Sequence, residues 1–86
     1  MNETGLKNRV KSYLVNTGWI VFKISDRFTA GIPDLVCMKD GRTIWIELKT
    51  PEGRVQPIQT WTINQIKSAG VEAYICRSIE EVKGIL

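Results

Sequence analysis

Hydrophobic and polar positions follow two different periods along the chain, and this divides it into helices and strands. Near the start, apolar residues recur at helical spacing with basic residues between them, at Leu6, Val10, Tyr13 and Leu14. Gly18 can end this segment, so we expect an amphipathic helix over roughly residues 3–17. Residues 19–24 alternate apolar and β-prone positions, which predicts a first strand followed by a polar loop over residues 25–31.

Two β-rich runs, residues 32–38 and 43–50, flank the dipeptide Asp40-Gly41. Asp-Gly between such runs is a strong signal for a tight hairpin, so these strands should be antiparallel neighbours. Counting outward from a two-residue turn places Asp34 directly opposite Glu47, at a non-hydrogen-bonded position of the ladder.

The second half of the chain predicts a helix, a strand and a short helix. Pro57 suits the first turn of a helix that ends at Gly70 and carries apolar residues at Ile58, Trp61, Ile66 and Ala69. Residues 71–76 predict a strand, and Ser78 followed by Glu81 resembles a capping box before a final short helix. The expected fold is therefore α/β in the order αβββαβα, with a central antiparallel hairpin in a mixed sheet flanked by helices.

Composition indicates one globular domain over residues 1–86. Apolar residues make up 43% and charged residues 24%, and no block of glycine, proline or serine indicates a linker. A core of this size gives marginal stability, which a homodimer interface would increase. The net charge of +3 is compatible with an anionic partner but is too modest to indicate one by itself.

The residue types present narrow the possible chemistry. The chain has no histidine and two cysteines, Cys37 and Cys76, which excludes a disulfide scaffold and histidine-dependent nucleophiles. We expect both cysteines to be buried thiols. No apolar run is long enough to span a membrane and no signal peptide is evident, which favours an intracellular, cytoplasmic protein. Catalysis would then depend on carboxylates, lysine or a hard metal ion.

The predicted hairpin brings these groups together. Asp34 and Glu47 face one another, and Lys49 lies on the same face, two residues beyond Glu47. Facing carboxylates weaken a strand pair unless a cation lies between them. Oxygen ligands suit Mg²⁺ or Mn²⁺, which can polarise a phosphodiester and activate water, while Lys49 could orient that water or stabilise developing charge. Taken singly, each residue also fits an ordinary solvated strand end.

The two faces of the hairpin differ in character. The opposite face is apolar and should form the core, with Leu35, Cys37, Ile44, Ile46 and Leu48. Val36 and Trp45 share the carboxylate face, so a helix should partly cover it. The three tryptophans occupy apolar positions of predicted elements, which favours core or subunit packing for Trp19, Trp45 and Trp61.

Two short motifs carry a resemblance to a known family. Gly31-Ile32-Pro33-Asp34 and Ile46-Glu47-Leu48-Lys49 resemble the motif of the PD-(D/E)xK nuclease superfamily. The continuation from Thr50 to Gly53, with Gln56, Gln59 and Trp61 downstream, is similar to the VRR-NUC family within that superfamily. The likeness extends over nearly the whole chain.

This resemblance implies a restriction-endonuclease-like core that depends on Mg²⁺, with Mn²⁺ able to substitute. It implies that Asp34, Glu47 and the Leu48 carbonyl bind the metal and that Lys49 is catalytic. Glu3 matches an acidic residue that approaches the metal through water, although the helix dipole also favours an acid there. Gln59 matches a glutamine near the active site; its spacing from Ile63 and Ile66 turns it toward the apolar side of its helix, which fits a site role or a boundary role.

The resemblance also implies a substrate and an assembly. Small stand-alone members are similar to Holliday-junction resolvases that act as homodimers, so we expect a DNA endonuclease acting on branched DNA. The alternatives are a flap or nicking nuclease, a catalytically silent DNA-binding module, and a structural adaptor. Basic residues near the motif or on the first helix are candidate phosphate contacts: Arg27, Arg54, Lys7, Lys11 and Lys23.

Overall fold

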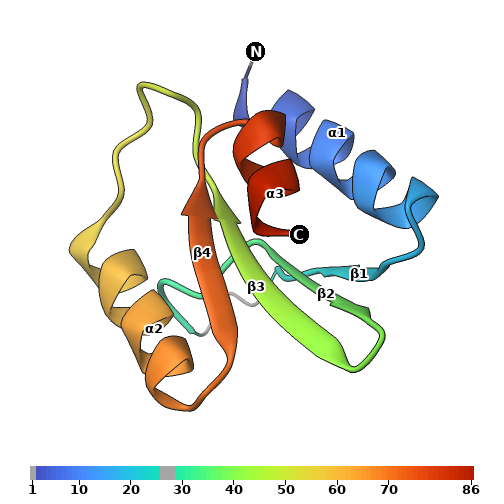
Figure 1. Cartoon of the computed structure of the whole chain (residues 1–86). Helices are drawn as coiled ribbons and strands as arrows, with labels where there is room; N and C mark the ends of the chain where they lie inside the picture. Colours follow the sequence, from blue (N-terminus) through green and yellow to red (C-terminus); the bar gives the residue numbers. More distant parts are fainter. Residues whose placement is uncertain (1, 26–28) are drawn as a thin grey trace.

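The computed structural model describes residues 2–25 and 29–86. Its elements follow the expected order αβββαβα, so the predicted fold class is confirmed (Figure 1). Their bounds are α1 (Glu3–Asn16), β1 (Ile20–Lys23), β2 (Leu35–Lys39), β3 (Arg42–Leu48), α2 (Pro57–Ser68), β4 (Glu72–Cys76) and α3 (Ile79–Ile85). Within the described ranges, no helix has the length and apolar character needed to cross a membrane.

The four strands form one mixed sheet in the order β1-β2-β3-β4. The pairs β1–β2 and β2–β3 are antiparallel, whereas β4 runs parallel to β3. A parallel neighbour requires a crossover connection, and α2 provides it. Figure 1 shows α1 and α3 on one face of the sheet and α2 on the other. The carboxyl ends of β3 and β4 therefore meet at the same edge, close to the start of α1.

The hairpin forms at the predicted turn, because Asp40 and Gly41 both adopt positive φ angles, 51° and 77°. This is the backbone conformation that a two-residue hairpin turn requires. The register pairs Val36 with Trp45, as expected, but the ladder ends one pair before the predicted carboxylate pair.

Asp34 therefore precedes β2 and is not a ladder partner of Glu47, which corrects the prediction of a strand over residues 32–38. Two properties of the sequence explain the early end. Pro33 has no N–H for a ladder bond, and the Asp34 side chain itself accepts the Leu48 N–H, at 2.8 Å.

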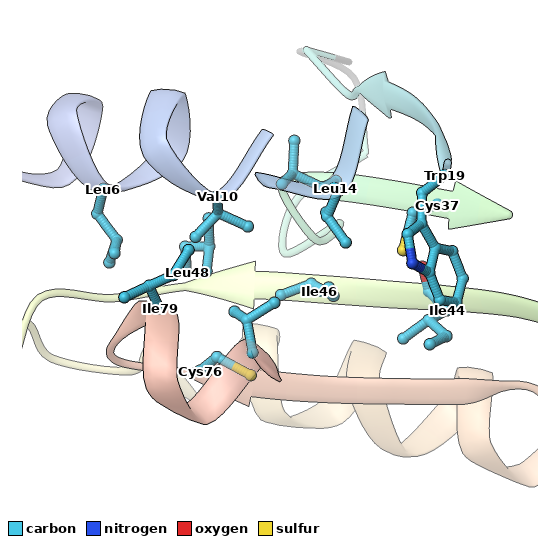
Figure 2. Close-up of a cluster of buried hydrophobic side chains, with 12 residues drawn as sticks. Leu6, Val10, Leu14, Trp19, Cys37, Ile44, Ile46, Leu48, Cys76 and Ile79 are labelled. Atoms are coloured by element: carbon cyan, nitrogen blue, oxygen red, sulfur yellow. The ribbon is translucent and has the colours of Figure 1, made fainter. Parts of the chain in front are cut away.

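The main core lies between the sheet and the two helices α1 and α3 (Figure 2). The predicted apolar face of the hairpin is fully buried there, which confirms the pattern read from the sequence. Both cysteines are buried and free, as predicted, and burial raises the pKa of each thiol to about 11. The buried set comprises Leu6, Val10, Leu14, Trp19, Leu35, Cys37, Ile44, Ile46, Leu48, Cys76, Ile79 and Val82.

Helix α2 turns toward the sheet the side that carries Gln59 and Ile63, and not the side of Ile58 and Trp61. Ile63 is 4% exposed, whereas Ile58 and Trp61 are 44% and 59% exposed, so the prediction that Trp61 packs in the core of this chain is wrong. Gln59 and Ile63 are four residues apart on one helical face, and that face contacts the sheet. The side chain of Trp61 consequently points away from it.

An ion pair links the hairpin to β4 at the edge of the sheet opposite the predicted site. Arg42 donates to both carboxylate oxygens of Glu72, at 2.6 and 2.8 Å, and to the carbonyls of Ile85 and Leu86. Tyr74 donates to the same carboxylate at 2.8 Å. These hydrogen bonds from Arg42 and Tyr74 lower the pKa of Glu72 to about 2.

The low pKa of Glu72 predicts a specific loss of stability in acid. A carboxyl group whose pKa falls from 4.5 to about 2 on folding stabilises the native state above the higher value, and this contribution disappears as the pH falls through that window. We expect Glu72→Gln to lower the free energy of unfolding at neutral pH, with a difference from the natural chain that shrinks between about pH 4.5 and 2. Urea denaturation across this range measures the difference, and the exposed Glu52→Gln serves as the control. A gap that stays constant with pH would contradict the assignment.

Candidate active site

Asp34 is held between two elements that are distant in the sequence. One oxygen of its carboxylate accepts the Leu48 N–H of β3, and the preceding loop packs against the first turn of α2. Gly31 makes this approach possible: its φ is +79°, and a Cβ atom there would lie 2.7 Å from the Ile58 carbonyl oxygen. Only glycine tolerates both conditions without displacing the backbone.

Glu47 is buried, with 2% of its surface exposed. Gln59 donates its amide N–H to the Glu47 carboxylate at 3.1 Å, and the Lys49 ammonium lies 3.7 Å from the same oxygen. Burial, with a further contribution from the negative charge of Asp34, raises the pKa of Glu47 to about 7. A cation close to a buried carboxyl group with a raised pKa would stabilise the ionised form of that group.

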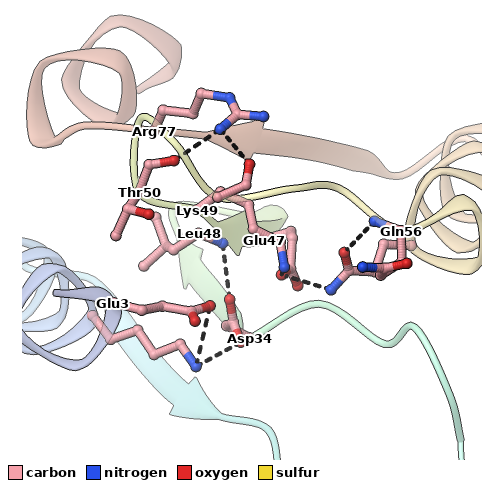
Figure 3. A network of polar contacts seen from close by, with 11 residues as sticks. Glu3, Asp34, Glu47, Leu48, Lys49, Thr50, Gln56 and Arg77 are labelled. Carbon is pink, nitrogen blue, oxygen red and sulfur yellow. Dashed lines mark hydrogen bonds and ion pairs between the residues drawn. The ribbon is translucent and has the colours of Figure 1, made fainter.

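Three carboxylates converge at this edge of the sheet. One oxygen each from Glu3, Asp34 and Glu47 lie within 4.8 Å of one another, so α1 brings the predicted acidic residue of the first helix to the hairpin. Figure 3 shows Glu3 and Asp34 side by side, with Glu47 beyond them toward the loop that leads to α2. Hard oxygen donors, one of them buried and electrostatically strained by its neighbour, fit a Mg²⁺ or Mn²⁺ ion.

Gln59 has a second contact that fixes its position. Its side-chain oxygen accepts the backbone N–H of Gln56 at 2.9 Å, which completes a capping box at the start of α2. The amide group therefore connects the helix cap to Glu47 and leaves the glutamine with little freedom. Gln59 therefore lies on the side of α2 that faces Glu47, and its expected role in the site stays a prediction.

Lys7 occupies a different position from the one expected of a DNA contact. Its ammonium lies 3.0 Å from the Asp34 carboxylate and 3.9 Å from that of Glu3. Burial alone would lower the pKa of Lys7, but the hydrogen bond and the charge of Asp34 outweigh it, so the pKa lies above its usual value. In this conformation Lys7 is part of the acidic cluster.

Sequence reasoning missed Arg77, which immediately follows β4. Its Nη1 atom donates to the carbonyl oxygens of Thr50 and Gly53, at 2.8 and 2.7 Å, and to that of Pro51 at 3.2 Å (Figure 3). The guanidinium thus holds the loop that leaves the site after Lys49. The position of Arg77 at the end of the strand parallel to β3 is the one signal that could have revealed it.

Three of the remaining basic candidates lie on the surface of the described chain. Lys11, Lys23 and Arg54 are exposed, and their predicted phosphate contacts stay predictions. Arg27, the other residue expected beside the motif, lies outside the residues that the structure describes.

An αβββαβα fold with carboxylates and a lysine gathered at adjoining strand ends is that of a nuclease-type domain. The VRR-NUC domain family matches residues 20–80, and the chain belongs to this family. The predicted family membership is therefore confirmed.

Solved structures agree on the fold. A structure described as a VRR_NUC domain is 21% identical with a TM-score of 0.84, and the match covers 96% of this chain and 91% of that one. A second, described as a VRR_NUC domain protein, is 18% identical with a TM-score of 0.81, covering 99% and 84%. No curated protein sequence matches this chain.

The contact between Gln59 and Glu47 predicts a functional effect that is separable from helix capping. In Gln59→Glu, the new carboxylate can still accept the Gln56 N–H, but it repels Glu47 instead of donating to it. We expect the rate of phosphodiester cleavage to fall by roughly tenfold or more, as for loss of an interaction that orients an active-site ligand. Steady-state nuclease assays measure the loss, and circular dichroism checks the fold.

The matched control for this change is Gln65→Glu, which adds the same charge to an exposed position of α2. It should leave the cleavage rate unchanged. Equal rates for the two variants would show that the amide of Gln59 contributes nothing to the site.

Proposed function

We propose that this chain is a divalent-metal-dependent endonuclease that hydrolyses DNA phosphodiesters, with residues 1–86 forming one nuclease domain. The observation that carries the proposal is the meeting of three carboxylates within 4.8 Å beside the Lys49 ammonium. Purely structural packing gives no reason to gather like charges at a partly buried strand end. Membership of a nuclease family supports the same reading.

Each residue of the cluster has a distinct proposed role. Asp34, Glu47 and the Leu48 carbonyl would hold Mg²⁺, or Mn²⁺ in its place, with Glu3 contributing through water. When bound, the ion supplies Lewis-acid chemistry by polarising the scissile phosphoryl group. Gln59 keeps the Glu47 carboxylate in position through its 3.1 Å hydrogen bond.

Lys49 is the proposed catalytic residue. Its side chain is 13% exposed, and its ammonium lies 3.7 Å from the Glu47 carboxylate. We assign it two tasks: it orients the attacking water and stabilises the negative charge that develops on the phosphate. The exposed Lys11, Lys23 and Arg54 are proposed contacts to the DNA backbone, and so is Arg27.

The proposed substrate is branched DNA, and the proposed assembly is a homodimer. Four-way junctions need two opposed cuts, which two copies of one site can supply. Exposed apolar side chains support self-association, since Ile20 and Phe22 on the edge strand β1 are 60% and 53% exposed. Sedimentation analysis tests the dimer: a mass of one chain at micromolar concentration would contradict it.

Cleavage of matched labelled substrates tests the function itself. A four-way junction, a flap, a linear duplex and a single strand would each be incubated with Mg²⁺, Mn²⁺ or EDTA. Paired symmetrical nicks confined to the junction, and abolished by EDTA, would support a dimeric resolvase. Flap-selective cutting would favour a flap nuclease, and binding without cleavage in any metal would leave a DNA-binding module.

A further inference from the structure

Both oxygens of the Asp34 carboxylate have partners within the protein. One accepts the Leu48 N–H at 2.8 Å, and the other lies 3.0 Å from the Lys7 ammonium. These partners differ in mobility, because the Leu48 N–H belongs to a strand paired on both sides, whereas Lys7 is carried by a flexible four-carbon stem. A cation that binds Asp34 can displace only the second partner without disturbing the sheet.

The position of Lys7 on α1 brings its ammonium to the acidic cluster. It follows Glu3 by one helical turn, so both side chains lie on the same side of the helix, and its ammonium reaches Asp34 and Glu3 together. Its side chain is 24% exposed, which leaves a path to solvent. An ammonium at this point offsets the repulsion between the three carboxylates, as a divalent cation would.

We propose that the Lys7 ammonium is an internal counter-ion of the acidic cluster, which a divalent cation must displace from Asp34 in order to bind. This inference rests on the proposed metal-dependent function and adds a consequence for the free protein. Lys7 stabilises the metal-free site and lowers its affinity for metal. The divalent cation replaces the ammonium beside Asp34, and Lys7 keeps its proton throughout.

Mn²⁺ affinity in the absence of DNA tests this competition directly. Isothermal titration would compare the natural chain with Lys7→Met and Lys7→Arg. Lys7→Met removes the competing charge while keeping the length of the stem, and we expect it to bind Mn²⁺ about tenfold more tightly. Lys7→Arg keeps the charge and should bind Mn²⁺ like the natural chain. Lys67→Met, which removes the same charge from the exposed end of α2, should also be unchanged.

Thermal unfolding gives a second readout that a merely structural role of Lys7 would not move in the same way. In EDTA, Lys7→Met should unfold at a lower temperature than the natural chain, because the carboxylates lose their counter-ion. Saturating Mn²⁺ should raise its melting temperature by more than it raises that of the natural chain. Should Lys7→Met not fold, Lys7→Gln makes the same comparison.

The possible outcomes separate this inference from the function on which it rests. Equal or weaker Mn²⁺ binding by Lys7→Met, with normal binding by the natural chain, would overturn the counter-ion role and leave the nuclease proposal intact. Absence of Mn²⁺ binding in every variant would overturn both. Tighter binding by Lys7→Met that Asp34→Asn abolishes would establish Asp34 as the group for which the two cations compete.

Discussion

Replacing Lys49 with alanine is expected to abolish detectable DNA cleavage, a loss of at least about a hundredfold, while the chain still folds. The ammonium lies 3.7 Å from the Glu47 carboxylate, and we propose that it stabilises charge on a bound phosphate. Alanine removes this ammonium, whereas the Lys7 ammonium contacts a different carboxylate, that of Asp34. The assay is cleavage of a labelled four-way junction in Mg²⁺, with circular dichroism to confirm the fold.

Asp34→Asn tests the other half of the same site and should give a loss of similar size. The asparagine oxygen can still accept the Leu48 N–H, so the loop keeps its anchor on β3 while the negative charge disappears. Lys67→Ala, an exposed change on α2, is the control and should cleave at the natural rate. Full activity in either site variant would refute the site assignment.

Gly31→Ala adds a single methyl group, yet it is expected to give the largest loss of stability among these variants. The added Cβ would lie 2.7 Å from the Ile58 carbonyl oxygen and 2.9 Å from the Thr62 hydroxyl, at a backbone φ of +79°. Left-handed backbone costs a non-glycine residue about 1 kcal/mol, and overlap with fixed backbone adds to it. We expect a decrease of about 3 kcal/mol in the free energy of unfolding, measured by urea denaturation.

Gly41→Ala is a matched control for the backbone contribution. Its φ of +77° is nearly the same, but no atom lies within 4 Å of the position of the new Cβ. It should therefore lose about 1 kcal/mol only. Equal losses in the two variants would show that the loop does not need to approach α2 so closely.

Cleavage by the two glycine variants extends the same comparison to function. Gly31→Ala must move the loop before Asp34 away from α2, which carries Gln59 and thereby supports Glu47. Its activity should fall even at temperatures where the protein remains folded. Gly41→Ala, at the far end of the hairpin, should keep its activity.

Much of the fold could be predicted from local chemistry. Helical spacing of apolar residues, the Asp40-Gly41 turn and the cap at Ser78 each act over a few residues, so their consequences are visible in a linear sequence. The turn also determined the register of β2 and β3, and with it the apolar face that forms the core. The same register brought Asp34 and Glu47 to one end of the hairpin.

Other features depended on packing between distant segments. The sequence did not reveal which side of α2 faces the sheet, because its apolar residues lie on more than one side; Ile63 is buried and Trp61 is exposed. Arg77 reaches the loop after Lys49 because β4 runs parallel to β3, a relation set by the crossover.

The acidic cluster contains both kinds of feature, those set by local sequence and those set by packing between distant segments. The sequence by itself determined that two carboxylates and a lysine lie at one end of the hairpin, because turn geometry and strand register are local. Only the tertiary structure decided that α1 brings Glu3 and Lys7 to them, because the direction of a helix depends on the core beneath it. The balance of charge in the site is therefore a property of the packed fold.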